Sequence, residues 1–171
     1  MNLFIIEGKG KIEAIKKYLG AEYQVFATAG HIRDLPAKSL GVQVNNNFEP
    51  IYEIMPDKKS IVNDLTKLAK KADKIYIATD PDREGEAIAY HISHILNIDT
   101  NDKVRVAFNA IDKETINNAL KEPRIIDLDL VNAQQARRVL DRLVGYKISP
   151  IICKKIKPNL SLNDFIESIK E

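Results

Sequence analysis

Hydrophobic residues in the first part of the chain alternate between two spacings. Continuous apolar runs of about five residues are typical of buried strands, and the stretches between them repeat apolar residues every three or four positions, as amphipathic helices do. The pattern predicts strands at 2–6, 23–27, 50–55, 74–79 and 104–108, and helices at 11–19, 60–72, 86–96 and 113–120. This alternation indicates an α/β fold with a mostly parallel sheet flanked by helices.

From residue 127 the pattern changes to one long helix that runs to about residue 144. Its apolar residues are predicted to lie on one side, at 133, 136, 139, 140, 143 and 144, and its polar residues on the other. A short amphipathic segment follows at 162–169. The sequence therefore predicts two domains, an α/β domain at 1–125 and a helical extension at 126–171.

Composition excludes several classes of protein. With 44% hydrophobic and 29% charged residues, the chain of 171 residues is an ordinary globular protein. No apolar run reaches the roughly 18 residues that a membrane span needs, so we expect no membrane partner. The single cysteine, Cys153, excludes an intramolecular disulfide and a cysteine-based zinc finger, and fits a cytoplasmic location. The net charge of +2 does not by itself indicate nucleic-acid binding.

The strongest chemical signal is an acidic cluster directly after the predicted strand 74–79. In an extended segment, Asp80, Asp82 and Glu84 would project from one face, since side-chain direction has a period of two. Glu7 follows the other most apolar strand, and loops at the carboxyl ends of neighbouring parallel strands meet at one edge of a sheet. Carboxylate oxygens suit Mg²⁺, so the cluster predicts a magnesium site. The alternative is an acidic surface turn that favours the start of a helix.

Two basic features suggest contact with phosphate groups. Glycines and lysines at 8–11 open a predicted helix, an arrangement that can bind an anion. Arg137, Arg138 and Arg142 lie close together on the long helix, as expected of a surface that contacts a nucleic-acid backbone. The alternatives are a flexible turn with solvated lysines and an ordinary solvated helix face. His31, in a polar loop, is the one histidine that we consider a functional candidate.

Three longer segments carry a family resemblance. GHIRDLP (30–36), TDPDREGEAIAYH (79–91) and NAQQARRVLDRLVGYKISP (132–150) strongly resemble type IA DNA topoisomerases, whose N-terminal domain has the Toprim (Rossmann-like) fold. The resemblance covers about residues 2–161, and the chain diverges from the family pattern at residue 162. It implies that residues 1–125 form a Toprim domain and that 126–171 resemble the start of the family's DNA-binding domain.

The resemblance also implies roles for individual residues. Glu7 matches the family's general acid, and Arg83 the arginine that stabilises charge at the scissile phosphate. The Mg²⁺ ligands would be Asp80, Asp82 and Glu84. Residues expected to contact DNA, chiefly single-stranded DNA, are Lys11, His31, Arg33, Arg137, Arg138, Asp141 and Arg142.

The family's reaction requires a nucleophilic tyrosine that this sequence does not match. None of its six tyrosines is followed closely by Arg-Thr, as the nucleophile of the family is. We therefore expect an N-terminal topoisomerase segment, inactive or nearly so alone, with the remaining topoisomerase domains in trans as a candidate partner. The alternatives are a stand-alone DNA-binding or regulatory module and a small Toprim nuclease.

Overall fold

A computed structural model of the protein describes residues 1–156. The chain separates into two compact units, each made of two stretches. The first unit contains Met1–Asp34 and Glu53–Gln134, and the second contains Leu35–Tyr52 and the stretch that starts at Gln135. These units divide the chain at other residues than 125, and the predicted domains 1–125 and 126–171 stay a prediction. The amphipathic segment predicted at 162–169 lies outside the described residues.

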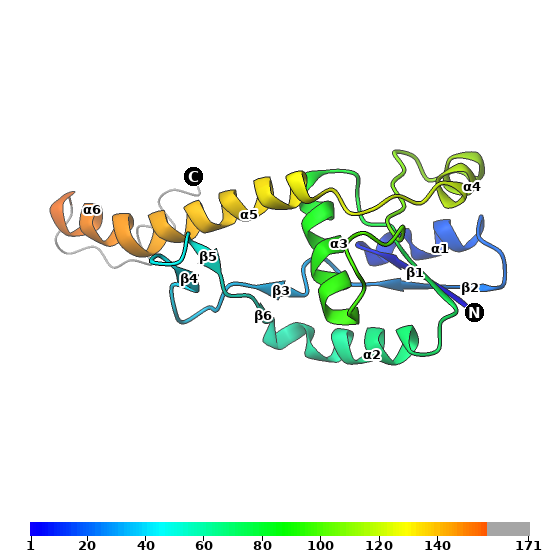
Figure 1. The fold of residues 1–171 in the computed structure, drawn as a ribbon, viewed down its shortest axis with the longest axis horizontal. Helices are drawn as coiled ribbons and strands as arrows, with labels where there is room; N and C mark the ends of the chain where they lie inside the picture. Colours follow the sequence, from blue (N-terminus) through cyan, green and yellow to red (C-terminus); the bar gives the residue numbers. More distant parts are fainter. Residues whose placement is uncertain (157–171) are drawn as a thin grey trace. The chain divides into compact units, whose positions relative to one another are not determined.

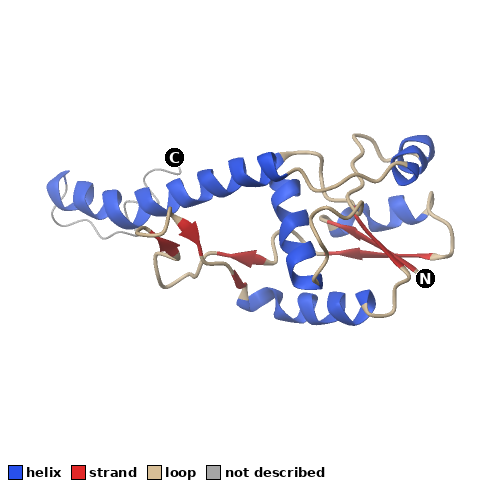
Figure 2. Ribbon diagram, viewed as in Figure 1, coloured by secondary structure: helices blue, strands red, loops and turns tan. Residues whose placement is uncertain are grey.

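The first unit is built on a parallel sheet of three strands (Figures 1 and 2). β1 (Asn2–Ile6) lies in the centre, with β2 (Tyr23–Ala27) on one side and β7 (Lys74–Ile77) on the other. Both pairings are parallel, with Phe4 opposite Val25 in β2 and opposite Tyr76 in β7. The predicted strands 2–6 and 23–27 are confirmed, and the predicted strand 74–79 ends two residues earlier than expected. The predicted α/β class is confirmed.

Successive residues of β1 are buried on opposite faces of this sheet. Leu3 and Ile5 pack in a hydrophobic cluster with residues of α2 (Lys59–Ala69) and α3 (Arg83–Leu96). Phe4 and Ile6 pack in a second cluster, with residues of α1 (Ile12–Lys16) and α4 (Lys113–Lys121). Because both faces are covered by helices, the central strand is apolar at every position from Leu3 to Ile6.

The remaining strands are short. β3 (Arg33–Asp34) pairs with β6 (Glu53–Ile54), and β4 (Val42–Gln43) pairs with β5 (Glu49–Pro50), both antiparallel. The single strand predicted at 50–55 is therefore wrong. The strand predicted at 104–108 is also wrong, because in that run only Arg105 forms bridges, to Ile77 and to Arg124. Short 3₁₀ turns, η1 (Lys9–Lys11) and η2 (Pro56–Lys58), precede α1 and α2.

The predicted long helix is present as α5 (Leu128–Leu143) and continues through a π-helical turn, η3 (Val144–Ile148), into α6 (Ser149–Ile156). Its predicted apolar side requires correction. Val139 and Leu143 pack with Leu35 and Val42 in the second unit, but Leu140 is 60% exposed. Among residues 1–156, no helix combines the length and the apolar character needed to cross a membrane.

Candidate functional site

The loops that follow the three parallel strands meet at one edge of the sheet. Glu7 directly follows β1, and its carbonyl accepts a hydrogen bond of 2.8 Å from the amide of Ala29, after β2. On the other side, the amide of Ala78, after β7, donates to the carbonyl of Ile5 at 2.7 Å. These bonds place Glu7 between the loop that leads to His31 and the loop that leads to Asp80.

Each of the three predicted metal ligands bonds a different partner. One carboxylate oxygen of Asp80 lies 2.6 Å from Nζ of Lys11, and one of Glu84 lies 2.6 Å from Nε2 of His31. One oxygen of Asp82 accepts a hydrogen bond of 2.7 Å from the amide of Gly85. The second oxygen of each carboxylate accepts no hydrogen bond from a described residue.

The backbone of the acidic cluster differs from the expected extended segment. Asp82 is the N-cap of α3, and Glu84 lies in the first turn of that helix. A carboxylate accepting an amide hydrogen bond at the N-cap stabilises a helix, so the alternative interpretation of the cluster as a helix start is also correct. Within residues 1–156, no three or more His, Cys, Asp or Glu side chains are arranged to hold a metal ion.

Negative charge is concentrated around Glu7. Burial raises the pKa of the Glu7 carboxyl, and the nearby charges of Asp80 and, more weakly, Asp82 raise it further. The charges of His31 and Lys11 act in the opposite direction without cancelling this rise. A carboxyl with a raised pKa remains protonated to higher pH, so Glu7 is suited to donate a proton.

The turn that carries the acidic residues is tightly closed. Oγ1 of Thr79 donates to the carbonyl of Gly85 at 2.6 Å. Gly85 is buried against the backbone of Asp80, and a Cβ atom there would overlap the carbonyl oxygen of Asp80. Glycine is therefore required at residue 85 to allow the close approach of two backbone segments.

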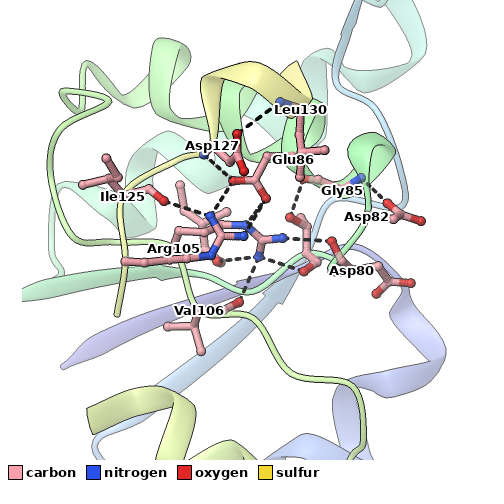
Figure 3. Close-up of polar contacts among 12 residues, drawn as sticks. Asp80, Asp82, Gly85, Glu86, Arg105, Val106, Ile125, Asp127 and Leu130 are labelled. Carbon is pink, nitrogen blue, oxygen red and sulfur yellow. Dashed lines mark hydrogen bonds and ion pairs between the residues drawn. The ribbon is translucent and has the colours of Figure 1, made fainter. Parts of the chain in front are cut away.

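A buried charged network behind this turn was not predicted from the sequence (Figure 3). Arg105 and Glu86 are both 0% exposed, and Nε of Arg105 donates to Glu86 at 2.9 Å. Arg124 donates to both carboxylate oxygens of Glu86, at 2.8 and 3.0 Å, and the amide of Asp127 donates to one of them at 2.7 Å. The one available signal was an arginine inside an apolar run, which needs a buried partner.

Burial and pairing act in opposite directions on Glu86. Burial raises the pKa of its carboxyl, but the hydrogen bonds from Arg124 and from the amide of Asp127, together with the charge of Arg105, leave that pKa below its ordinary value. Glu86 is therefore an ionised carboxylate in the interior, and its charge is compensated by two arginines.

Other predicted site residues lie nearby in the first unit. Arg83 is the exposed first residue of α3, directly after Asp82. Arg33 lies in β3 and is half-buried, and its charge lowers the pKa of His91. His91 is buried, and the centre of its ring lies 6.2 Å from that of His31.

The predicted DNA-contacting residues of α5 lie in the second unit. Arg137 and Asp141 are exposed, with 4.0 Å between their charged groups. Arg138 is half-buried. Arg142, also predicted to contact DNA, bonds the protein's own backbone: its guanidinium donates to the carbonyls of Pro36 at 2.7 Å and of Ser39 at 3.1 Å, and lies 5.1 Å from the centre of the Tyr146 ring. Arg142 therefore holds the loop after β3.

Comparison with known proteins identifies the type of domain. The family model of the Toprim domain matches residues 2–111. Among solved structures, full-length topoisomerase I from Thermotoga maritima is similar to this chain, with a TM-score of 0.85 and 45% sequence identity over 94% of this chain and 27% of that one. The predicted resemblance to type IA DNA topoisomerases and the predicted Toprim fold are both confirmed. The chain spans about a quarter of the length of the Thermotoga protein.

Replacing Gly85 with alanine should destabilise the turn, because the added methyl group overlaps the backbone of Asp80. We expect Gly85→Ala to lower the free energy of unfolding by about 1–3 kcal/mol, as overpacked sites do. Chemical denaturation measures this difference. Gly145→Ala is the matched control, because a Cβ at Gly145 would meet no atom within 4 Å. Equal stability of the Gly85→Ala variant and the wild-type protein would contradict the close approach.

Burial of His91 should make the fold sensitive to acid. Burial lowers the pKa of His91 from 6.5 to about 3, with the charges of Arg33 and His31 acting in the same direction. Between these values the unfolded chain binds the proton and the folded chain does not. The contribution of neutral His91 to the free energy of unfolding is therefore fully present above pH 6.5. It is lost as the pH falls toward 3, by about 1.4 kcal/mol per pH unit.

The variant His91→Gln removes this titration. Its free energy of unfolding should fall less steeply than that of the wild-type protein between pH 6 and about pH 4, when both are measured by urea denaturation. His94→Gln, at an exposed position of the same helix, serves as the control and should retain most of the wild-type slope. Identical slopes for the wild type and His91→Gln would show that His91 does not stay neutral in the folded protein.

Proposed function

Because the chain belongs to the Toprim domain family, we propose that it is the Mg²⁺-binding, DNA-contacting N-terminal segment of a type IA DNA topoisomerase. In this proposal it contributes the acidic site to an isomerase that cleaves and religates one DNA strand and relaxes supercoiled DNA. The nucleophilic tyrosine would come from topoisomerase domains outside this sequence.

The observation that carries the proposal is the set of three carboxylates at the sheet edge. Asp80, Asp82 and Glu84 each use one oxygen for a protein contact and keep a second oxygen available, beside a carboxyl at Glu7 whose pKa is raised. Hard oxygen donors at a site with excess negative charge fit Mg²⁺. These three carboxylates are not arranged around one point in this structure, so in this proposal they would hold Mg²⁺ after moving closer together. A bound Mg²⁺ would supply positive charge for a DNA phosphate.

Glu7 and the basic residues have separate roles in this proposal. The raised pKa of Glu7 supports a role as proton donor to the 3′ oxygen that leaves when the strand is cut, and as base on religation. Lys11, now paired with Asp80, and the exposed guanidinium of Arg83, which stands between Asp82 and Glu84 in the sequence, would contact the phosphate. Arg137, exposed on α5, would contact the DNA backbone.

Metal binding can be tested without DNA. Asp82→Asn removes one negative charge but keeps a side chain that caps helices as well as aspartate does. We expect this variant to bind Mg²⁺ at least about tenfold more weakly than the wild type by isothermal titration calorimetry. Glu13→Gln, which removes an exposed carboxylate of α1, should leave the affinity unchanged. Equal affinity of Asp82→Asn and the wild type, or no binding by the wild type, would refute the proposed metal site.

Contact of Arg83 and Arg137 with DNA predicts a change in salt dependence. Loss of one phosphate contact should reduce the slope of log K against log salt by about 0.7 for single-stranded DNA. We therefore expect both Arg83→Ala and Arg137→Ala to bind an oligonucleotide less tightly and with a shallower slope, as measured by fluorescence anisotropy. Lys74→Ala is the control, because Lys74 begins β7 and lies at the opposite edge of the sheet from Asp80. A slope that stays unchanged in either arginine variant would remove that residue from the proposed interface.

Assays on negatively supercoiled plasmid with Mg²⁺ distinguish the proposed function from the alternatives. We expect no relaxation by this chain alone, and relaxation when a topoisomerase I that lacks its own Toprim domain is added. Nicking by the chain alone that is lost in Asp82→Asn would instead indicate a Toprim nuclease. Binding of single-stranded DNA without nicking or restored relaxation would indicate a binding or regulatory module.

A further inference from the structure

The turn that carries the acidic residues receives hydrogen bonds from the buried guanidinium of Arg105. We propose that Arg105, held in place by Glu86, is the positioning residue of this turn and sets the backbone from which Asp80, Asp82 and Glu84 project. This inference rests on the proposed function in one respect, because it assigns the positioned carboxylates to metal binding. The positioning itself can be measured without metal or DNA.

The geometry of Arg105 supports this role. Its Nη1 atom donates to the carbonyls of Thr79 at 2.8 Å and of Val106 at 2.9 Å, and more weakly to that of Ile77 at 3.2 Å. Its Nη2 atom donates to the carbonyl of Asp80 at 2.8 Å. One planar group thus joins the end of β7 to the first residue of the acidic cluster.

The carbonyls of Thr79 and Asp80 need such a donor. β7 ends at Ile77, so these two groups lie beyond the strand pairing. Thr79 is buried, and a buried carbonyl without a hydrogen bond is costly. Because an arginine presents several N–H groups in a rigid plane, it can bond both carbonyls at once and fix the angle between them. A lysine, with one nitrogen at the end of a flexible chain, cannot reproduce this arrangement.

The ion pair with Glu86 determines where the guanidinium lies. Both side chains are fully buried, and a buried charge is retained only beside an opposite charge. Glu86 lies two residues after Glu84 in the first turn of α3, the helix that the acidic turn begins. Arg105 therefore holds the turn at both ends. It bonds the carbonyls of Thr79 and Asp80 at the first end and forms the ion pair with Glu86 at the second.

Arg124 provides a matched comparison. Its side chain bonds the same Glu86 carboxylate through two nitrogens and donates to the carbonyl of its neighbour Ile125, while its main chain pairs with that of Arg105. Arg105→Met and Arg124→Met therefore each leave Glu86 with one arginine partner. The first variant removes the donors to the acidic turn, and the second does not.

Hydrogen exchange of the intact chain, followed by mass spectrometry without added metal, tests the positioning. In Arg105→Met we expect amides of residues 79–86 to exchange at least about tenfold faster than in the wild type, with little change in the β2 residues 23–27. In Arg124→Met the exchange of residues 79–86 should stay within about twofold of the wild type. Equal acceleration in the two variants, or none in Arg105→Met, would overturn the proposal.

Two further variants keep the test decisive if Arg105→Met does not fold. Arg105→Lys keeps the positive charge but loses the planar set of donors, and it should accelerate exchange of residues 79–86. Glu86→Gln keeps the shape of the partner but removes its charge, and it should accelerate the same segment. Wild-type exchange of residues 79–86 in a folded Arg105→Lys variant would overturn the proposal.

Metal affinity separates this inference from the proposed function. If the wild type binds Mg²⁺, Arg105→Met should bind it at least about tenfold more weakly, and Arg124→Met should bind it within about twofold of the wild type. Equal Mg²⁺ affinities of Arg105→Met and the wild type would overturn the inference that Arg105 positions the carboxylates for metal binding. If the wild type binds no Mg²⁺, the proposed metal site is refuted, and hydrogen exchange alone decides whether Arg105 positions the turn.

Discussion

The parallel pairing of β1 with β2 and β7 is the constraint on which the candidate site depends. In a parallel sheet all strands end at the same edge, so the residues that follow each strand are brought together whatever their distance in sequence. Glu7, His31 and Asp80 are neighbours for this reason. The site therefore requires the apolar strands that carry it. A shift of one residue in the register of β1 would exchange its two buried faces and displace Glu7 from this edge.

Charge balance explains the contacts that the acidic residues make at this edge. Carboxylates that lie close together repel one another, and the structure relieves this repulsion with Lys11 at Asp80 and His31 at Glu84. The relief is incomplete, since the pKa of Glu7 remains above its ordinary value because of burial and of the charge of Asp80. This residual negative charge is the physical basis of the proposed Mg²⁺ site, and in that proposal Lys11 and His31 would exchange their carboxylate partners for a DNA phosphate.

Side-chain periodicity predicts only part of this structure. A continuous apolar run marked β1 correctly, because burial on both faces leaves a strong sequence signal, and β2 was also predicted with its correct bounds. Because loops at the carboxyl ends of neighbouring parallel strands meet at one edge of a sheet, Glu7 and Asp80 were then predicted to lie close together. Arg105 was missed because its partner Glu86 lies 19 residues away, and no local pattern encodes a buried ion pair. The contacts of Arg142 on α5 were missed as well. Arg142 bonds backbone carbonyls of a distant loop, and every residue has such a carbonyl, so no side-chain pattern marks them.

The network around Glu86 also reaches the start of α5. Glu86 belongs to the segment 79–91, and its carboxylate accepts the amide hydrogen of Asp127, which directly precedes α5. Asp127 in turn accepts the amides of Asp129 and Leu130, so its side chain caps the start of α5, the helix that contains most of the segment 132–150. One buried carboxylate thus takes part both in holding the acidic turn and in fixing the start of α5. A change in the charge or position of Glu86 would therefore act on both the acidic turn and the start of α5.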